Sequence, residues 1–395
     1  MRAAWIAALG AALLLALGAG IWLGGHPATL PSFLRDRLVG ASGGISAEAT
    51  ELIEENYYQP ANHSSLTDSS LGGMVRGLRR HFHDRYSEYF APKAATGFNE
   101  ELDGHYSGVG IEIALTARGI LTKRVLPESP ARKAGIVHGD VIISVEGRPL
   151  AGKSLLLANK WITGPEGTSV RLGIVRPGRR GVESVRVTRA EIATPVTFTQ
   201  IKRVDGRKLG YLRYSSFTAG SDKLVAKALR RLEREGAQGI VLDLRGNGGG
   251  FLQEAVAIAS LFMAQGKVVV STTSRADGNS VYRSSGGDLV RIPLVVLIDR
   301  DTASSAEILT AALADDVGAT VVGTRSYGKG VFQQEIPLAN GGALKLTVGQ
   351  YFTPRGVNLA GKGIHPDVYV RDNPRTRRDE AMQRALAVLA HRVPG

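Results

Sequence analysis

Short apolar runs alternate with amphipathic runs between residues 209 and 323, and this alternation constrains the fold more than any other feature of the chain. The apolar runs have the length and composition of buried strands and lie at 209–212, 239–244, 268–271, 294–298 and 320–323. Helical periodicity occupies 221–235, 252–262 and 305–313. Strands separated by helices require crossover connections, so the chain is predicted to be an α/β protein with a substantially parallel sheet. Functional groups are expected at the carboxyl ends of those strands.

Two polar residues lie beyond such strand ends. Ser304 follows the apolar run 292–299, and Lys329 lies in the glycine-flanked loop 327–330. A serine hydroxyl needs a neighbouring base, and His365 is the only histidine between residues 191 and 372. A lysine whose pKa is lowered by apolar surroundings can replace histidine. The pair predicts a serine nucleophile activated by lysine; a helix-capping serine and a solvated loop lysine are the alternatives.

Segment 246–250 is a glycine-rich turn between a predicted strand and a predicted helix. A turn without side chains lets backbone N–H groups approach a substrate, and the first N–H groups of a helix have no intrahelical acceptor. Oxyanion-hole donors are therefore expected at Ser305 and at Gly249 or Gly250. The alternatives are a plain tight turn and a phosphate-binding loop, although no lysine and serine or threonine follow in Walker spacing.

Residues 106–187 contain short β-like runs separated by glycine, proline and aspartate. The loop 108–111 and the later segment 129–142 resemble, in this order, the two sequence signatures of PDZ domains. Successive N–H groups of a glycine loop can bind a carboxylate, and an adjacent strand edge can pair with an extended peptide. The predicted peptide-binding residues are Gly108, Val109, Gly110 and Ile111.

Residues 3–23 are continuously apolar and follow Arg2. This pattern predicts a signal anchor or a signal peptide within residues 1–25, with the rest of the chain outside the cytoplasm. The protein is then expected to be anchored to the cell membrane or released, for example into a periplasm. Residues 26–44 are expected to form a linker, and amphipathic runs predict a small helical region at 45–103.

Composition and net charge limit the kinds of bonds, metals and partners that the chain can have. The chain has no cysteine, which excludes disulfides, thiolate metal sites and a cysteine nucleophile. Its net charge of +13 favours contact with anionic surfaces. Because the basic residues are dispersed and no nucleic-acid-binding motif accompanies them, lipid is the expected partner and nucleic acid is not. The alternative is a basic surface that only keeps the protein soluble. No metal site is expected, because His81, His83 and Asp84 have no further ligand at a suitable spacing.

Three segments of the α/β region, 243–250, 302–307 and 327–333, are together similar to the motifs of the carboxyl-terminal processing proteases, also called tail-specific proteases. Segment 361–368 matches the closing motif of that family, and 84–90 resembles the motif before its PDZ domain. The resemblance implies a crotonase/ClpP-like α/β protease core, an inserted β-rich PDZ domain, and no metal or organic cofactor. By position it implies the nucleophile Ser304, the general base Lys329, the lysine-orienting Gln333, and oxyanion-hole amides at Ser305 and Gly249 or Gly250.

Two positions depart from the family motifs. The family usually has serine, alanine and serine before a glutamate, whereas Ser304, Ser305 and Ala306 precede Glu307 here. Two adjacent serines are thus candidates, and Ser304 is the expected nucleophile because it keeps the family spacing to the glutamate and to the lysine. In the pre-PDZ motif, Arg85 stands where the family has proline.

The resulting boundaries are 104–190 for the PDZ domain, 191–372 for the protease core and 373–395 for a basic helical tail. The predicted function is a serine endopeptidase that captures accessible protein or peptide C-termini through the PDZ domain and cleaves by acyl transfer. The alternatives are a noncatalytic PDZ scaffold at the membrane and an acyl-CoA-handling enzyme. Serine, lysine and glutamine together disfavour the scaffold, and the PDZ-like insert disfavours the acyl-CoA enzyme.

Overall fold

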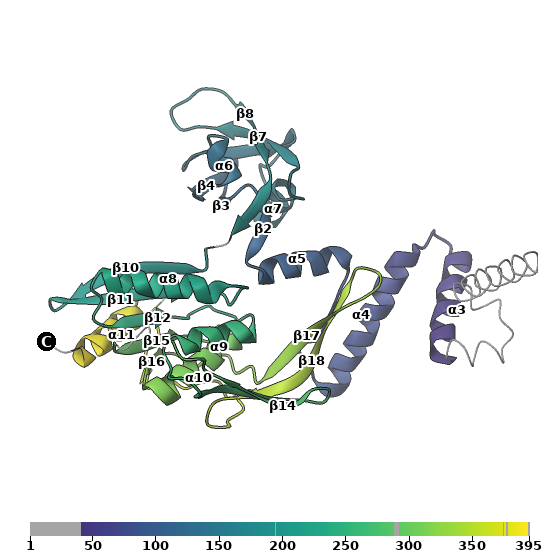
Figure 1. The fold of residues 1–395 in the computed structure, drawn as a ribbon. Helices are drawn as coiled ribbons and strands as arrows, with labels where there is room; N and C mark the ends of the chain where they lie inside the picture. Colours follow the sequence, from purple (N-terminus) through teal and green to yellow (C-terminus); the bar gives the residue numbers. More distant parts are fainter. Residues whose placement is uncertain (1–40, 194, 288–291, 374, 377, 394–395) are drawn as a thin grey trace, which may run out of the picture. The chain divides into compact units, whose positions relative to one another are not determined.

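The computed structural model describes residues 41–193, 195–287, 292–373, 375–376 and 378–393 (Figure 1). It comprises two compact units, Met1–Ala91 and Pro92–Gly395. The apolar segment 3–23 and residues 26–40 of the expected linker lie outside the described residues. None of the helices within the described ranges has the length and apolarity needed to cross a membrane.

The described part of the first unit is mainly helical. Its elements are α3 (Ala41–Asn56), α4 (His63–Phe82) and the short strand β1 (Glu88–Phe90). The side chain of Asn62 caps α4 by accepting the N–H of Ser65, and His83, in the left-handed conformation, ends it. Helix α3 begins inside the segment 26–44 that was expected to be a linker.

A six-stranded sheet in the order β10-β11-β12-β15-β16-β19 forms the core of the second unit. The strands are β10 (Thr197–Val204), β11 (Arg207–Tyr214), β12 (Ile240–Asp243), β15 (Leu294–Ile298), β16 (Thr320–Gly323) and β19 (Val368–Tyr369). Neighbours from β11 to β19 pair in parallel, and β10 runs antiparallel to β11. The predicted parallel sheet is confirmed. Its central strands β12 and β15 are buried throughout, as expected for a sheet covered on both faces.

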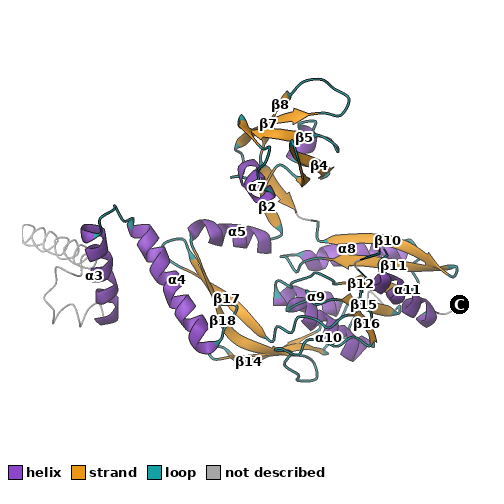
Figure 2. Ribbon diagram, turned by 180° about the vertical axis from the view of Figure 1, so that it is seen from behind, coloured by secondary structure: helices purple, strands orange, loops and turns teal. Residues whose placement is uncertain are grey.

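Helices cover both faces of this sheet (Figure 2). One face packs against α8 (Ser221–Arg234), α9 (Leu252–Ser260) and α10 (Ser305–Val317). The other face packs against α11 (Glu380–Arg392), which buries Met382 and Leu389 in the same cluster as Val295. The segment 373–395, expected as a basic tail, therefore contributes a layer of the protease core, because one face of its helix is apolar.

A second sheet in this unit is antiparallel. Strand β13 (Val268–Ser274) lies between β14 (Gly278–Arg283) and β18 (Ala343–Phe352), and β18 also pairs with β17 (Val331–Pro337). Placing 268–271 in the parallel sheet is therefore wrong. An apolar run predicts a strand but not its partner, and here the short connection to β14 favours a hairpin. Strand β17 begins two residues after Lys329, so this sheet helps to position the lysine loop.

An inserted β-rich domain lies between α5 (Pro92–Leu102) and the core. Its sheet has the order β3-β4-β5-β7-β8, with β6 beside β5. The strands are β3 (Ile111–Thr116), β4 (Gly119–Val125), β5 (Val141–Val145), β6 (Arg148–Pro149), β7 (Ser169–Val175) and β8 (Glu183–Thr188), and the helices are α6 (Pro130–Lys133) and α7 (Leu155–Ile162). Strands β2 (His105–Gly108) and β9 (Ala190–Ala193) pair where the chain enters and leaves the domain. The predicted compact β-rich module is confirmed, and it has its own apolar core.

Candidate active site

Ser304 lies between the end of β15 and the start of α10, in a strained backbone conformation. Its φ of 58° and ψ of −122° are unusual for a residue with a side chain. Such strain costs about 1–3 kcal/mol and persists where the surrounding structure enforces it, often at active sites. The side chain is partly exposed. A sharp strand-to-helix turn of this kind presents a serine hydroxyl to a substrate.

The neighbouring Ser305 is placed differently. It is only 1% exposed, and its Oγ donates a hydrogen bond to the carbonyl of Gly250 at 2.8 Å. This hydroxyl therefore ties the start of α10 to the glycine turn. Of the two adjacent serines, only Ser304 is partly exposed.

Lys329 lies in a loop that is packed tightly between glycines. A Cβ added to Gly328 would lie 2.7 Å from the nitrogen of Gly363, and one added to Gly330 would lie 2.5 Å from the nitrogen of Ala360. Both residues that flank Lys329 must therefore be glycine, so that the segment 358–363 can pack against the loop that carries the lysine. The backbone of Lys329 has little freedom as a result.

The pKa of Lys329 is lowered to about 8, first by burial and then by the positive charge of Lys345 on β18, while Glu307 acts in the opposite direction. Val331 and Phe332 are partly buried beside it in sequence, whereas Tyr327 is 47% exposed and shields less than its aromatic character predicts. A lysine with this pKa has a neutral fraction near physiological pH and can accept a proton.

Glu307 holds the backbones of Ser304 and Lys329 together. In the sequence it stands out only by its spacing from Ser304. Its carboxylate is fully buried. One oxygen, Oε2, accepts the backbone N–H of Ser304 at 2.9 Å and that of Lys329 at 3.0 Å. The other, Oε1, accepts the Ser326 hydroxyl at 2.5 Å and the Gly328 N–H at 2.7 Å. The spacing of serine and glutamate by three residues at a helix start is a capping-box signal that could have identified it.

The glycine turn lies against Ser304. A Cβ on Gly249 would come within 2.8 Å of the Ser304 Cβ, and the φ of Gly249 is +99°. The N–H of Gly249 donates to the side chain of Asn247 at 2.9 Å, so it is already occupied. Of the two glycines predicted as oxyanion donors, Gly249 therefore serves close packing, and Gly250 keeps an N–H without an acceptor in the described part of the chain. The same holds for Gly248, which sequence reasoning missed.

Asn247 and Thr302 connect the turn to the serine loop. Asn247 is fully buried. Its side-chain amide donates to the backbone carbonyl of Tyr214, and its backbone carbonyl accepts the N–H of Ala303. The Thr302 hydroxyl donates to the carbonyl of Leu244 at 2.9 Å. These buried hydrogen bonds fix the glycine turn relative to Ser304.

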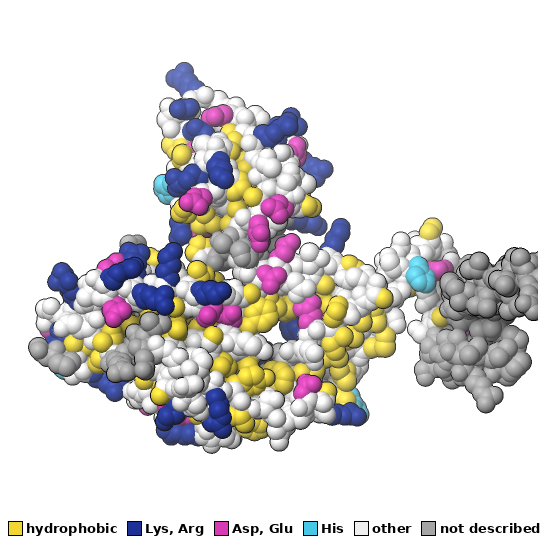
Figure 3. All heavy atoms as spheres, viewed as in Figure 1, with side chains coloured by type: hydrophobic (Ala, Val, Ile, Leu, Met, Phe, Trp, Pro, Cys, Tyr) yellow, Lys and Arg dark blue, Asp and Glu magenta, His cyan; other side chains and the backbone are white. Residues whose placement is uncertain are grey.

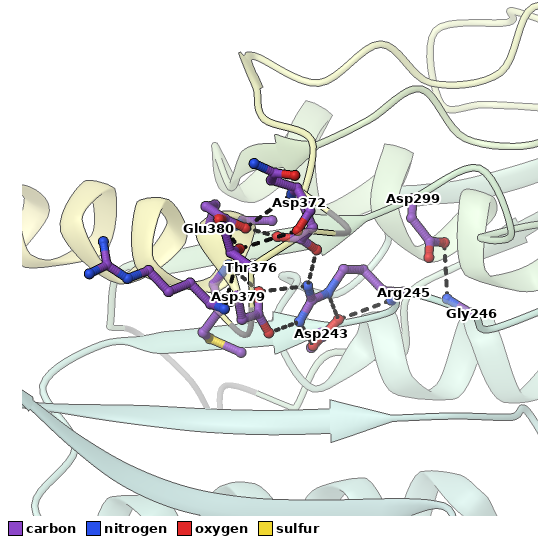
Figure 4. Close-up of polar contacts among 12 residues, drawn as sticks. Asp243, Arg245, Gly246, Asp299, Asp372, Thr376, Asp379 and Glu380 are labelled. Carbon is purple, nitrogen blue, oxygen red and sulfur yellow. Dashed lines mark hydrogen bonds and ion pairs between the residues drawn. The ribbon is translucent and has the colours of Figure 1, made fainter.

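Arg245 fixes the other side of the turn (Figure 4). Its guanidinium pairs with Asp243 at the end of β12, at 2.7 Å, and with Asp379 at the start of α11, at 2.8 Å; Asp372 lies at 3.3 Å. The side chain of Asp243 is almost fully buried and also accepts the hydroxyl of Tyr211. The C-terminal helix is thereby linked to the strand that carries the glycine turn.

Gln333 lies on β17, where its side-chain amide donates to the hydroxyl of Thr347 on β18 at 3.2 Å. A register shift between Phe332 and Gln333 interrupts this pairing of β17 with β18. Irregular strands of this kind re-aim side chains near sites. The residue thus belongs to the sheet that follows the lysine loop.

The predicted peptide-binding residues 108–111 lead into β3, the end strand of the inserted sheet. Gly110 has a φ of +77°, and a Cβ there would clash with Ser129, which caps the short helix α6. The carbonyls of Val109 and Gly110 accept N–H groups from Ala131 and Leu126, so the loop is fixed from inside the domain. Strand β3 is an edge strand of the inserted sheet.

Comparison with known protein families identifies both the α/β core and the inserted domain. Residues 208–370 match the model of peptidase family S41, and residues 122–176 match that of the PDZ domain. Carboxy-terminal processing protease CtpB of Bacillus subtilis is 35% identical over 324 residues, which cover 82% of this chain and 67% of CtpB. The carboxy-terminal-processing protease of Bartonella bacilliformis is 33% identical over 327 residues, covering 81% of this chain and 73% of that protein.

Two solved protease structures have a similar fold. The photosystem II D1 C-terminal processing protease superposes with a TM-score of 0.50 at 25% identity, over 86% of this chain and 96% of that one. A putative S41 protease from Bacteroides fragilis shares the fold with a TM-score of 0.55 at 19% identity, over 85% of this chain and 91% of that one. Fold and site thus define a serine protease with an α/β core and a PDZ domain. The chain belongs to peptidase family S41 and, within it, to the carboxy-terminal processing proteases.

Proposed function

We propose that this serine endopeptidase cleaves polypeptides near their C-termini with a dyad of Ser304 and Lys329. The observation that carries the proposal is that both residues donate their backbone N–H to one carboxylate oxygen of Glu307. Two residues that are 25 positions apart are thereby fixed beside each other. The lowered pKa of Lys329, caused first by burial, gives the pair a base that works near neutral pH.

The proposed reaction is acyl transfer. The neutral amine of Lys329 takes the proton of the Ser304 hydroxyl, and Oγ attacks the scissile carbonyl carbon. The tetrahedral intermediate collapses, Lys329 returns the proton to the leaving amine, and an ester remains on Ser304. Water then attacks this ester while Lys329 accepts its proton. The second intermediate collapses, Lys329 returns the proton to the Ser304 oxygen, and the carboxylic acid product leaves.

The oxyanion of each intermediate is proposed to bind two backbone N–H groups. Ser305 supplies the first donor, because it opens α10 and its N–H has no intrahelical acceptor. Gly250 is the favoured second donor, since the N–H of Gly249 is already used. Loss of one such donor typically lowers kcat by about 100- to 1,000-fold. Gln333 is proposed to orient the amine of Lys329 from β17.

Capture of the substrate is assigned to the inserted domain. An extended C-terminus would add a strand beside β3, with its carboxylate at the loop formed by Gly108, Val109, Gly110 and Ile111. This assignment is supported by the edge position of β3 and by the rigid packing of the loop. A substrate with an amidated C-terminus should then be cleaved with a higher KM and a similar kcat.

The test compares wild type with Ser304→Ala, Ser305→Ala and Lys329→Ala on a protein that has an unstructured apolar tail. Ser304→Ala and Lys329→Ala should abolish cleavage and labelling by a serine-directed phosphonate, whereas Ser305→Ala should retain both in part. Full activity in either dyad variant overturns the dyad. Absence of labelling and cleavage in the wild type would favour a noncatalytic peptide-binding scaffold.

Two broader assignments accompany the dyad. The apolar segment 3–23 after Arg2 supports an extracytoplasmic location, with the chain held at the membrane or released. The central parallel sheet with helices on both faces supports a core of the crotonase/ClpP-like type. Fractionation of cells with and without alkaline extraction would test the location.

A further inference from the structure

Helix α4 of the first unit has two exposed faces of opposite character. Met74, Leu78 and Phe82 follow one another at intervals of four residues, so they lie on one face, and they are 60%, 39% and 66% exposed. Three large apolar side chains at such exposure are costly in water.

The other face carries guanidinium groups. Arg76, Arg79 and Arg80 share this face, because they are three and four residues apart. With His83, Asp84 and Arg85 they line an open hollow of about 510 Å³ at the end of α4. The hollow is thus surrounded by four guanidinium groups and one carboxylate.

The contacts of these arginines leave most of their charge available. Arg79 donates to the carbonyls of Asp84 and Arg85 at 3.3 and 3.4 Å, which folds the following loop back onto the helix. Arg76, Arg80 and the Arg85 side chain have neither an ion pair nor a hydrogen bond within the described part of the chain. Asp84 uses its carboxylate to accept the N–H groups of the two residues at 86 and 87.

Basic side chains are also present elsewhere on the surface. On the face shown in Figure 3, Lys and Arg side chains are spread among neutral and acidic ones. Several basic groups elsewhere are paired; Arg245, for example, contacts three aspartates. Arg85 also occupies the position at which the pre-PDZ motif has proline, so this chain adds a charge to the hollow.

We propose that α4 is a lipid-docking helix that lies on an anionic membrane surface. A helix with Met, Leu and Phe on one face and arginines on the other is the usual form of an interfacial helix, with the apolar face at the acyl boundary and the basic groups at the headgroups. Phosphate groups match guanidinium groups in charge and geometry. The apolar segment 3–23 precedes α4 in the chain and would hold the helix near the bilayer.

The test uses the full chain, in which the absence of cysteine makes a single label possible. Met74→Cys is labelled with an environment-sensitive dye, and the protein is reconstituted in phosphatidylcholine vesicles with or without phosphatidylglycerol. The expected result is a blue shift of the dye in the anionic vesicles alone. It should be lost at about 1 M salt, where the Debye length is about 3 Å.

Neutralising Arg76, Arg79 and Arg80 to Gln should lower the ratio of inserted to free dye roughly 100-fold in anionic vesicles, because each basic residue near such a surface contributes about a fivefold factor. The matched control neutralises three exposed basic residues on one face of α8, namely Lys227, Arg230 and Arg234. Protease activity reports folding in every variant.

Three outcomes would overturn the proposal. The dye could respond equally in neutral and anionic vesicles, or the α8 control could lose the shift as strongly as the α4 variant. A response to inorganic phosphate or glycerol phosphate without vesicles, of the same size as that to vesicles, would assign the hollow to a soluble phosphate. None of these outcomes affects the dyad, since activity is measured separately.

Discussion

The backbone N–H groups of Ser304 and Lys329 converge on a single carboxylate oxygen, Oε2 of Glu307, at 2.9 and 3.0 Å. The two nitrogens can therefore be no further apart than the sum of these distances. A buried carboxylate that accepts several N–H groups holds them strongly, because charge-assisted hydrogen bonds are about twice as strong as neutral ones. The relative position of the proposed nucleophile and base thus depends on one side chain that need not touch the substrate.

Glu307→Gln should test this positioning role. The amide has one acceptor oxygen and adds a donor that faces N–H groups, so some of the buried donors lose their partner. We expect kcat/KM to fall roughly 100-fold and the folded state to lose about 1–3 kcal/mol. Glu233→Gln, at an exposed position on α8, is the control. Activity within twofold of wild type for Glu307→Gln would contradict the role.

The pH dependence of cleavage should report Lys329. Its pKa is lowered from 10.5 to about 8, first by burial and then by Lys345. Because the neutral amine is the proposed base, kcat/KM should rise about tenfold per pH unit well below pH 8 and level off above it. The measurement is kcat/KM from about pH 6 to pH 10. An inflection near the ordinary lysine value would show that burial does not tune this residue.

Lys345 offers a way to move that inflection. Its ammonium lies 5.0 Å from the ring centre of Phe98, and its charge lowers the pKa of Lys329. Lys345→Met removes the repulsion, so the inflection should shift to higher pH and activity at pH 7 should fall. Lys345→Arg keeps the charge and should leave the inflection in place. An unchanged profile in Lys345→Met would exclude this repulsion as a cause.

Local patterns in the sequence predicted the elements of the core better than their partners. The apolar runs 294–298 and 320–323 are strands β15 and β16 with the expected bounds. The run at 268–271 is also a strand, but its register partners are β14 and β18 in the antiparallel sheet. Strand pairing depends on contacts between distant segments, which periodicity does not contain.

The same holds for the candidate active site: local sequence patterns indicate its residues but not their long-range contacts. Ser304 and Lys329 could be selected because a serine after a strand and a glycine-flanked lysine are visible locally. The occupied N–H of Gly249 could not, since it depends on how Asn247 folds back. The helix predicted from residue 221 is α8, but its capping group comes from a distant segment, because the side chain of Glu254 accepts the N–H groups of Gly220 and Asp222.

Gly249→Ala should damage the site by direct contact. The added Cβ would lie 2.8 Å from the Ser304 Cβ and 2.9 Å from the carbonyl oxygen of Ala303, so Ser304 must shift. A displacement of about 1 Å can cost roughly 100-fold in rate. Gly246→Ala is the control: its φ of +70° is also left-handed, but the added Cβ meets nothing within 4 Å. It should lose about 1 kcal/mol of stability and little activity, and equal losses in both variants would point to strain alone.

Arg245→Met should loosen the C-terminal helix from the glycine turn. It leaves the nearly fully buried Asp243 without its counter-charge, and breaking one side of a buried pair typically costs about 3–5 kcal/mol. Asp372→Asn removes a partner that is 44% exposed and should cost less than about 1 kcal/mol. Denaturant unfolding of both variants measures the difference.

The free energy of unfolding at acid pH can separate the loss of this ion pair from the loss of side-chain packing. Burial raises the pKa of Asp379, but the hydrogen bonds from Arg245 and from the N–H of Met382, together with the nearby positive charges, outweigh it, so the pKa lies below the ordinary value. A carboxylate with a lowered pKa stabilises the fold above its unfolded pKa, and this contribution is lost as the pH falls through its folded pKa. The stability gap between wild type and Arg245→Met should therefore narrow in acid. A gap that stays constant from neutral pH to acid pH would mean that Arg245 contributes mainly through its apolar stem.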